Sequence, residues 1–325
     1  MRLLKIVPDN TNIKFLKWRN LAISISIAMI IGSIALVAIR GLNFGVDFAG
    51  GLMMEVRFEK PVELDELRSS VNSAGAGAAS LQNFGDPRTV AVRLPLPPGD
   101  DAAVQKVVTK IQDSIKANHK DAEFRRVETV SGKVSGELIR DGAMALILAM
   151  IGISIYIWFR FEWQFGVGAL FALVHDVALT LGFFALTQLE FDLNIVAALL
   201  TIIGYSLNDT IVVYDRIREN LRKYRKMNIE EILDLSINET LSRTIVTSLS
   251  MIIALGTLVV LGGSVLFGFS VAMLLGIVIG TYSSIFIGAS ILLWMGVGPH
   301  SFMPSDANDP EARMKARAAA ERGQV

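Results

Sequence analysis

The 325-residue sequence contains no cysteine and only three histidines. The missing thiols exclude disulfides, thiolate metal sites and cysteine nucleophiles, and so few histidines argue against a histidine-rich metal site. Basic and acidic residues balance at 31 each, so the formal net charge is zero. This balance argues against a nucleic-acid partner. No set of nucleophile, base and orienting group is visible, which makes an enzyme the weakest candidate.

Charged residues are also scarce, at 19% of the chain, whereas 52% of the residues are hydrophobic. A helix needs roughly 20 apolar residues to cross a bilayer. The uncharged run from Thr244 to Pro299 is too long for one span, and Gly262, Gly263 and Ser264 supply a break in it. The sequence therefore predicts a polytopic α-helical membrane protein with six spans, over residues 21–39, 141–159, 164–187, 193–214, 243–262 and 267–295.

Basic residues gather in three segments outside these spans, residues 1–20, 215–242 and 296–325. Short loops rich in Lys and Arg stay in the cytoplasm, so we expect both termini and the loop 215–242 on that side. The turn from Gln188 to Asp192 carries no base and is expected on the opposite side. The first apolar run exceeds a signal core and lacks a clean A-x-A site, which predicts an uncleaved anchor.

Residues 40–140 then lie outside the membrane and are numerous enough to form a domain. Segments typical of strands and helices follow one another there as β-α-β-β-α-β, which predicts a ferredoxin-like α+β domain. Such a domain serves unrelated functions, so its fold identifies none. The junction LNFGVDFAGG, residues 42–51, is either a turn into the first strand or a hinge that couples the membrane to the outer domain. Its motif residues are Asn43, Gly45, Asp47, Gly50 and Gly51.

Asp209 lies inside the fourth predicted span, where a charged side chain costs about 2.5 to 3.5 kcal/mol. One interpretation is a structural carboxyl, protonated or bonded to Tyr205, Ser206 or another helix. We favour the other, a carboxylate that titrates as ions pass, because relays are the best-attested use of such acids. Arg243, at the start of the fifth span, suits an interfacial anchor and is also the nearest plausible counter-charge. Polar residues that would support this site are Tyr205, Asn208, Thr247, His175 and Asp176.

His175 and Asp176 lie near the middle of the third span. Adjacent residues point about 100° apart on a helix, so these two side chains need not share a face. A structural hydrogen bond between helices is favoured over proton transfer, but both interpretations stay open. In the sixth span a small residue recurs every fourth position, which is typical of close helix packing. These residues are Gly276, Gly280, Ser284 and Gly288.

Four stretches together resemble the SecF members of the SecD/SecF family, which is related to the resistance-nodulation-division (RND) exporters. They are NFGVDFAGG after the first span, VHDVALTLGFFAL in the third, GYSLNDTIVVYDRIREN in the fourth and SRTIVTSLS at the fifth. The resemblance covers nearly the whole chain, and only the Ala- and Arg-rich tail after Met303 stands apart from it.

The resemblance implies a multi-pass subunit of an accessory protein translocase in the bacterial inner membrane. It implies SecD as a partner, the SecYEG channel and YajC or YidC as further contacts, and an unfolded polypeptide as the translocated substrate. The proton or sodium motive force would drive export, with no metal and no cofactor besides the transported H+ or Na+. By motif, Asp209 corresponds to the family's relay aspartate and Arg243 to the arginine near it.

Two other functions compete with this interpretation. A half-size RND-type exporter of small molecules or lipids would share the membrane fold, but such exporters usually join two six-helix halves with large outer domains in one chain. A structural module that only holds SecD or the channel would use the same polar groups for packing alone.

Overall fold

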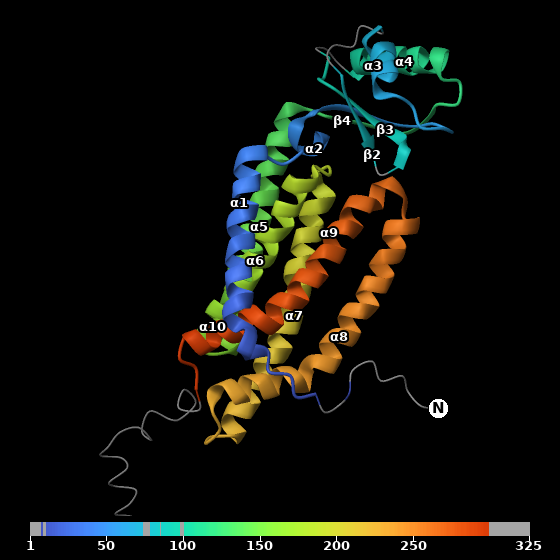
Figure 1. Ribbon diagram of the computed structural model, residues 1–325. Coiled ribbons are helices and arrows are strands. Elements are labelled where there is room, and N and C mark those ends of the chain that lie inside the picture. Colours follow the sequence, from blue (N-terminus) through green and yellow to red (C-terminus); the bar gives the residue numbers. More distant parts are fainter. Residues whose placement is uncertain (1–7, 9–10, 74–78, 85, 98–100, 299–325) are drawn as a thin grey trace, which may run out of the picture.

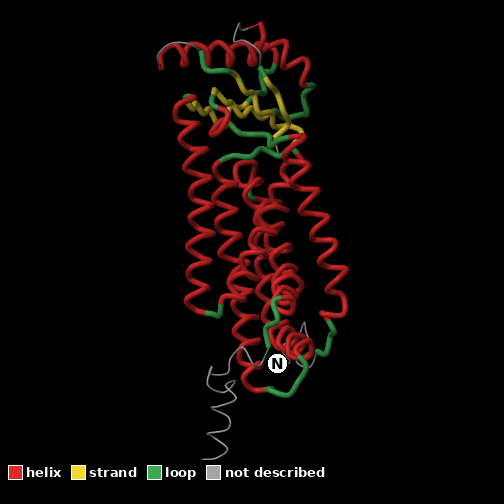
Figure 2. The backbone as a smooth tube through the Cα atoms, turned by 90° about the vertical axis from the view of Figure 1, so that its left-hand side faces the viewer, coloured by secondary structure: helices red, strands yellow, loops and turns green. Residues whose placement is uncertain are grey.

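Long apolar helices form most of the protein, as its hydrophobic runs predict. The structure, a computed structural model, describes residue 8 and residues 11–73, 79–84, 86–97 and 101–298. Within these residues, six helices are long and apolar enough to cross a membrane. Figures 1 and 2 show them as one bundle with a small domain of strands and helices at one end.

The six spans of the bundle are built from long helices, one of which is interrupted. Five are continuous: α1 (Arg19–Arg40), α5 (Gly132–Arg160), α6 (Trp163–Thr187), α7 (Leu193–Lys223) and α8 (Ile229–Leu261). The sixth span is the interrupted one. It consists of α9 (Gly263–Tyr282), the π-helical segment η2 (Ser283–Gly288) and α10 (Ala289–Trp294). A short 3₁₀ helix, η1 (Phe15–Trp18), precedes α1.

Burial separates central helices from peripheral ones. Most of α6 and α7 is buried inside the bundle, whereas α1, α5 and α8 expose large apolar side chains. Ile39, Phe159 and Val260 are examples, each more than three-quarters exposed. Exposed apolar surface on this scale suits contact with lipid rather than with water.

One predicted boundary is wrong, because the segment 215–242 is not a loop. Helix α7 continues to Lys223, and α8 begins at Ile229 after a short turn. The first turns of α8 cross the lower end of the bundle before the helix rises beside α9 (Figure 1). Their apolar residues Ile232, Leu233 and Ile237 are buried there. The charged residues of this segment end the apolar run of the fourth predicted span, but they do not end a helix. Likewise, α5 begins at Gly132, within the range assigned to the outer domain.

The described part of the outer domain, residues 51–73, 79–84, 86–97 and 101–130, contains four strands and two helices. They follow in the order β1 (Gly51–Arg57), α3 (Leu64–Ser73), β2 (Ser80–Phe84), β3 (Asp86–Leu94), α4 (Asp101–Asn118) and β4 (Glu123–Val130). The strands pair antiparallel in the order β2-β3-β1-β4. The sequence predicted this order of elements, and the ferredoxin-like class itself stays a prediction.

Successive side chains of β1 point to opposite faces of the sheet, and both faces are buried. Leu52, Met54 and Val56 join the core formed with α3 and α4. Met53 points to the other face, where it packs with Val46 of the short helix α2 (Val46–Ala49). The sheet therefore lies between α3 and α4 on one side and the membrane helices on the other (Figure 2). This layering places the junction motif between the outer domain and the bundle.

Candidate functional site

Asp209 lies in α7 with only 3% of its surface exposed. Its Oδ2 atom has no hydrogen-bond partner among the described residues. Arg243, an exposed residue of α8, is near enough to act on this carboxyl electrostatically. No direct ion pair joins the two side chains, both of which lie in the described part of the chain. The arrangement is therefore a buried, unpaired carboxyl with a guanidinium nearby, not a closed salt bridge.

The polar residues predicted to support Asp209 do not bond to its Oδ2 atom. The Tyr205 hydroxyl is buried without a partner among the described residues, and Asn208 is exposed on the outside of α7. The Thr247 hydroxyl donates to the Arg243 carbonyl at 3.0 Å, one turn earlier in its own helix. Ser206, considered as a possible partner of Asp209, donates elsewhere. The interpretation in which Tyr205 or Ser206 donates a hydrogen bond to Asp209 is therefore wrong.

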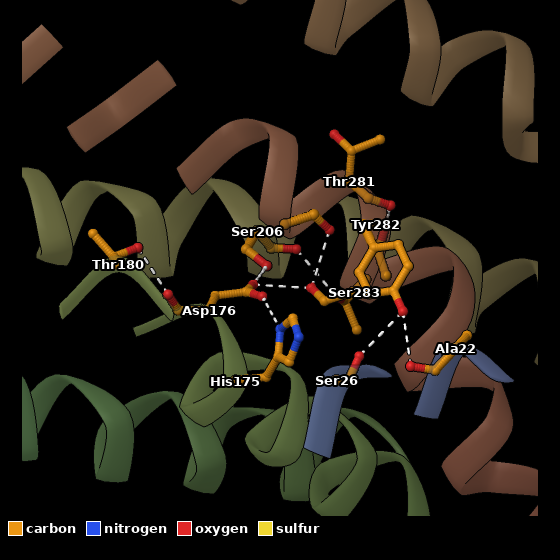
Figure 3. Close-up of polar contacts among 12 residues, drawn as sticks. Ala22, Ser26, His175, Asp176, Thr180, Ser206, Thr281, Tyr282 and Ser283 are labelled. Atoms are coloured by element: carbon orange, nitrogen blue, oxygen red, sulfur yellow. Dashed lines mark hydrogen bonds and ion pairs between the residues drawn. The ribbon is translucent and has the colours of Figure 1, made fainter. Parts of the chain in front are cut away.

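Asp176 is the acceptor at the centre of a buried polar cluster (Figure 3). Its Oδ1 atom lies 2.9 Å from Nδ1 of His175, and both side chains are 1% exposed. The hydroxyls of Ser206 and Ser283 donate to its Oδ2 atom at 2.5 and 3.0 Å. The two adjacent side chains of α6 therefore meet each other, and Asp176 ties α6 to α7 and to the π-helical segment η2.

Tyr282 connects this cluster to the first helix. Its ring centroid lies 6.0 Å from that of His175. Its hydroxyl donates to the carbonyl of Ala22 at 2.9 Å and lies 3.1 Å from the Ser26 hydroxyl, both in α1 (Figure 3). Sequence reasoning missed Tyr282, Ser283 and Ser26, because single hydroxyls in apolar helices give no signal of their partners. Among the described residues, no group of three or more His, Asp or Glu side chains is placed to hold a metal ion.

The small residues of the last span face α7 of the same chain. A Cβ atom added to Gly276 would overlap the side chain of Ile202, and one added to Gly280 would lie 3.0 Å from Cβ of Ser206. This approach brings α9 close enough for Ser283 to reach the Asp176 cluster. The row continues along the π-helical segment with Ser284 and Gly288.

Glycines at the junction occupy positions that a side chain would disturb. Gly51 has φ +120°, and an added Cβ would lie 2.6 Å from the carbonyl oxygen of Leu94. Gly50 has φ +70°, in the left-handed region that favours glycine. A Cβ on Gly45 would lie 2.7 Å from Oε1 of Glu190. The motif thus turns the chain sharply from α2 into β1 against the turn between α6 and α7.

Polar side chains of the junction bind the outer domain to that turn. The Asn43 amide donates to the carbonyl of Gln188 at 2.8 Å, and Arg93 of β3 donates to Oδ1 of Asn43 at 3.2 Å. The Asp47 carboxylate accepts from the backbone N–H of Leu193, the first residue of α7, at 2.9 Å. The junction is therefore bonded to the start of a membrane helix on one side and to the sheet on the other.

Arg93 and Glu190 form an ion pair across this junction that the sequence did not indicate. Their charged atoms lie 2.7 Å apart, and the side chains are 16% and 11% exposed. Burial raises the pKa of Glu190, and Arg93 opposes that effect. Burial also raises the pKa of Asp192, the N-cap of α7. The two acids of that turn were the only signal in the sequence, since Arg93 lies far away along the chain.

Comparison with known proteins places most of the chain in one family. Residues 110–298 match "Protein export membrane protein SecD/SecF, C-terminal", and residues 35–62 match "SecD/SecF GG Motif". A protein translocase subunit SecF from Vibrio alginolyticus is 44% identical over 303 residues, covering 93% of this chain and 96% of that protein. One from Rickettsia felis is 45% identical over 290 residues, covering 89% and 94%.

Two solved structures share the fold. SecDF from Thermus thermophilus, described as a translocon-associated membrane protein, has a TM-score of 0.82 and 34% sequence identity over 90% of this chain. SecDF in a super-membrane-facing form has a TM-score of 0.65 and 33% identity over 96% of this chain. The chain spans about two-fifths of each of those proteins, 40% in both cases.

Proposed function

Because the chain belongs to the SecD/SecF family of protein export membrane proteins, we propose that it is an ion-driven subunit of a SecDF-type accessory translocase. The proton or sodium motive force, acting at Asp209, would promote export of an unfolded polypeptide through the SecYEG channel. The single observation that carries this proposal is the buried, unpaired carboxyl of Asp209 in a membrane-spanning helix, with Arg243 nearby.

Two opposing effects act on the charge state of the Asp209 carboxyl. A guanidinium nearby favours a charged carboxylate, whereas burial without partners favours a neutral one. Small movements of α7 against α8 would change which influence is larger, and the carboxyl would then bind or release an ion. Such a coupling between ion binding and helix position is what a gradient-driven motor requires.

The energy available from one ion limits the mechanism. A charge that crosses the membrane gains about 2.3 kcal/mol per 100 mV. Inverting a two-state population from 1:99 to 99:1 needs about 5.5 kcal/mol. One proton therefore biases a movement of the outer domain without fully reversing it, so export would need repeated cycles or more than one ion.

A partner in the membrane is supported by polar residues that this chain leaves exposed. Asn208 on α7 and Arg243 and Ser250 on α8 lie on the outside of the bundle, on helices long enough to span a membrane. Polar groups that face lipid are costly and usually face protein or water instead. We propose SecD as that partner, with SecYEG and YajC or YidC as further contacts. The similar SecDF chains support SecD as the partner, because this chain covers only 40% of each of them and the rest of each chain extends beyond the matched part.

The proposed location is the bacterial inner membrane, with both termini in the cytoplasm. The outer domain would face the periplasm, since it lies at the end of the bundle opposite the basic turn between α7 and α8 (Figure 1). Short basic loops stay on the cytoplasmic side.

The test is export of a reporter protein into energised inverted membrane vesicles, with and without an uncoupler. Asp209→Asn keeps the size of the side chain but cannot ionise, so it should assemble with SecD and lose the uncoupler-sensitive part of export. Asp209→Glu should keep part of that activity. Arg243→Lys, which preserves a positive charge, should export better than Arg243→Ala.

Asp215→Asn is the matched control. Asp215 lies on the same helix, but its side chain is 61% exposed, so its replacement should leave uncoupler-sensitive export unchanged. All variants are compared at equal amounts of the complex. Export by Asp209→Asn at the wild-type rate, with the wild-type response to uncoupler, would assign this carboxyl to packing and refute the proposal.

A further inference from the structure

We propose that His175 and Asp176 form a second proton-binding site in this chain, separate from Asp209, whose exchangeable proton sits on Nε2 of His175. The inference deepens the proposed ion-driven function and rests on it for a role in export. The protonation itself is a separate property that can be measured without export.

The charge balance of the pair is the first argument. The imidazole and the carboxylate are both 1% exposed and 2.9 Å apart. An isolated buried charge is costly, whereas a buried pair of opposite charges costs less. With one proton on each ring nitrogen, His175 balances the negative charge of Asp176. When the Nε2 proton leaves, the carboxylate still accepts from the imidazole Nδ1–H and from the two serine hydroxyls, which stabilise its charge.

The second argument is that His175 Nε2 is buried and has no hydrogen-bond partner among the described residues. Buried polar atoms without a partner are uncommon in folded proteins and call for an explanation, and Nδ1 is already held by Asp176. Nε2 is therefore the atom at which a proton can enter or leave, with water as the acceptor or donor. The step is balanced, because the imidazolium loses Nε2–H to water and becomes a neutral ring with Nδ1–H still bonded to Asp176.

No other acid or base on a neighbouring helix replaces Asp176 in this role. In the described structure, α1 has no titratable side chain between Arg19 and Arg40, and η2 and α10 have none. The titratable side chains in the membrane parts of the other helices that contact α6 are Asp141 and Tyr156 on α5, Tyr205, Asp209 and Tyr214 on α7, and Tyr282 on α9. Tyr282 is bonded to α1 rather than to His175.

The third argument is the position of the acceptor Asp176, which joins α6 to α7 and to η2. Ser206 precedes Asp209 by three residues, so both lie on a similar face of α7. Ser283 begins the π-helical segment η2, and such segments occur frequently at functional sites. A change of charge at the pair would alter two hydroxyl contacts at once (Figure 3). The protonation state of the pair would thus act on the helix that carries Asp209.

The histidine content of the chain permits a direct test. His119 and His300 are the only other histidines, so His119→Gln with His300→Gln leaves His175 as the only one. The full-length chain, labelled with ¹⁵N-histidine, is placed in phosphatidylethanolamine–phosphatidylglycerol vesicles, and solid-state NMR reports which ring nitrogens carry protons. Across the pH range in which the chain stays folded, the wild-type ring should change from two protonated nitrogens to one. Asp176→Asn should lose the doubly protonated ring, and Asp176→Glu should restore it.

An exposed carboxyl of α7 supplies the control. Asp215, whose side chain is 61% exposed, lies outside the cluster, so Asp215→Asn should leave the protonation of the His175 ring as it is in the wild type. A ring that keeps one tautomer throughout the range, or the same titration in Asp176→Asn as in wild type, would overturn the inference. Loss of the doubly protonated ring in Asp176→Glu would also count against the pair, because that variant keeps the carboxylate. Failure here leaves the Asp209 proposal intact, whereas export by Asp209→Asn would refute that proposal without affecting the His175 titration.

Discussion

Gly51 permits the sharp turn from the bundle into the sheet because it has no side chain. Its φ of +120° is rarely adopted by other residues, and an added Cβ would meet the Leu94 carbonyl at 2.6 Å. We therefore expect Gly51→Ala to lower the free energy of unfolding by roughly 1 to 3 kcal/mol from the backbone conformation alone, and further through the contact. The measurement is the thermal unfolding midpoint of the full-length chain in mild detergent.

Gly41→Ala is the comparison that isolates the contact. Gly41 also has a positive φ, +71°, but nothing lies within 4 Å of an added Cβ. Its replacement should therefore lower the midpoint less than that of Gly51. Equal effects of the two substitutions would show that the close approach to β3 contributes nothing to stability.

Between elements, the turn from α6 to α7 and strand β3 are joined by the Arg93–Glu190 ion pair. Burial raises the pKa of Glu190 above its ordinary 4.5, with Arg93 opposing. Such a carboxyl binds its proton more tightly in the folded state than in the unfolded state. Its contribution to stability is therefore fully present below about pH 4.5 and is lost as the pH rises through the raised value. Relative to Glu190→Gln, the wild-type protein should lose stability as the pH rises from 4.5 toward neutrality.

Unfolding midpoints of both proteins across that range give the difference directly. Glu63→Gln removes an exposed carboxylate from the outer domain and tests whether the loss of any acid has the same effect. A constant difference between wild type and Glu190→Gln at every pH would mean that Glu190 has the same affinity for protons in the folded and unfolded states.

The elements differ in how well the sequence predicts them. Six membrane helices and the order of strands follow from hydrophobic runs and alternation, which are local properties. The start of α8 at Ile229 was missed because charged residues interrupt the apolar pattern there, although the helix continues through them. Asp209 was identified as a candidate from its cost in lipid. The sequence did not identify the partners of Asp176 and Glu190. Ser283 and Arg93 approach these acids only in the folded chain.

At the scale of the whole molecule, helix α7 connects the two candidate ion sites to the junction. The Asp176 cluster and Asp209 are both on or against α7, and α7 begins at the turn that Asp47 and Arg93 bind from the outer domain. A shift of α7 driven by protonation would therefore act on the junction without an additional moving element. Rigid helices that transmit small shifts are a common basis of such coupling.

The direction of any such movement depends on how the molecule lies in the membrane. Because the chain contains no cysteine, a single cysteine at exposed Ser80 in β2 or at exposed Lys223 at the end of α7 reports each side separately. An impermeant thiol reagent added to intact spheroplasts should label Ser80→Cys and not Lys223→Cys, since the basic turn stays in the cytoplasm. Permeabilised cells should label both, which shows that each thiol is reactive. The reverse pattern would place the outer domain in the cytoplasm. Ion flow down the gradient would then act on a domain on the wrong side to pull a polypeptide outward.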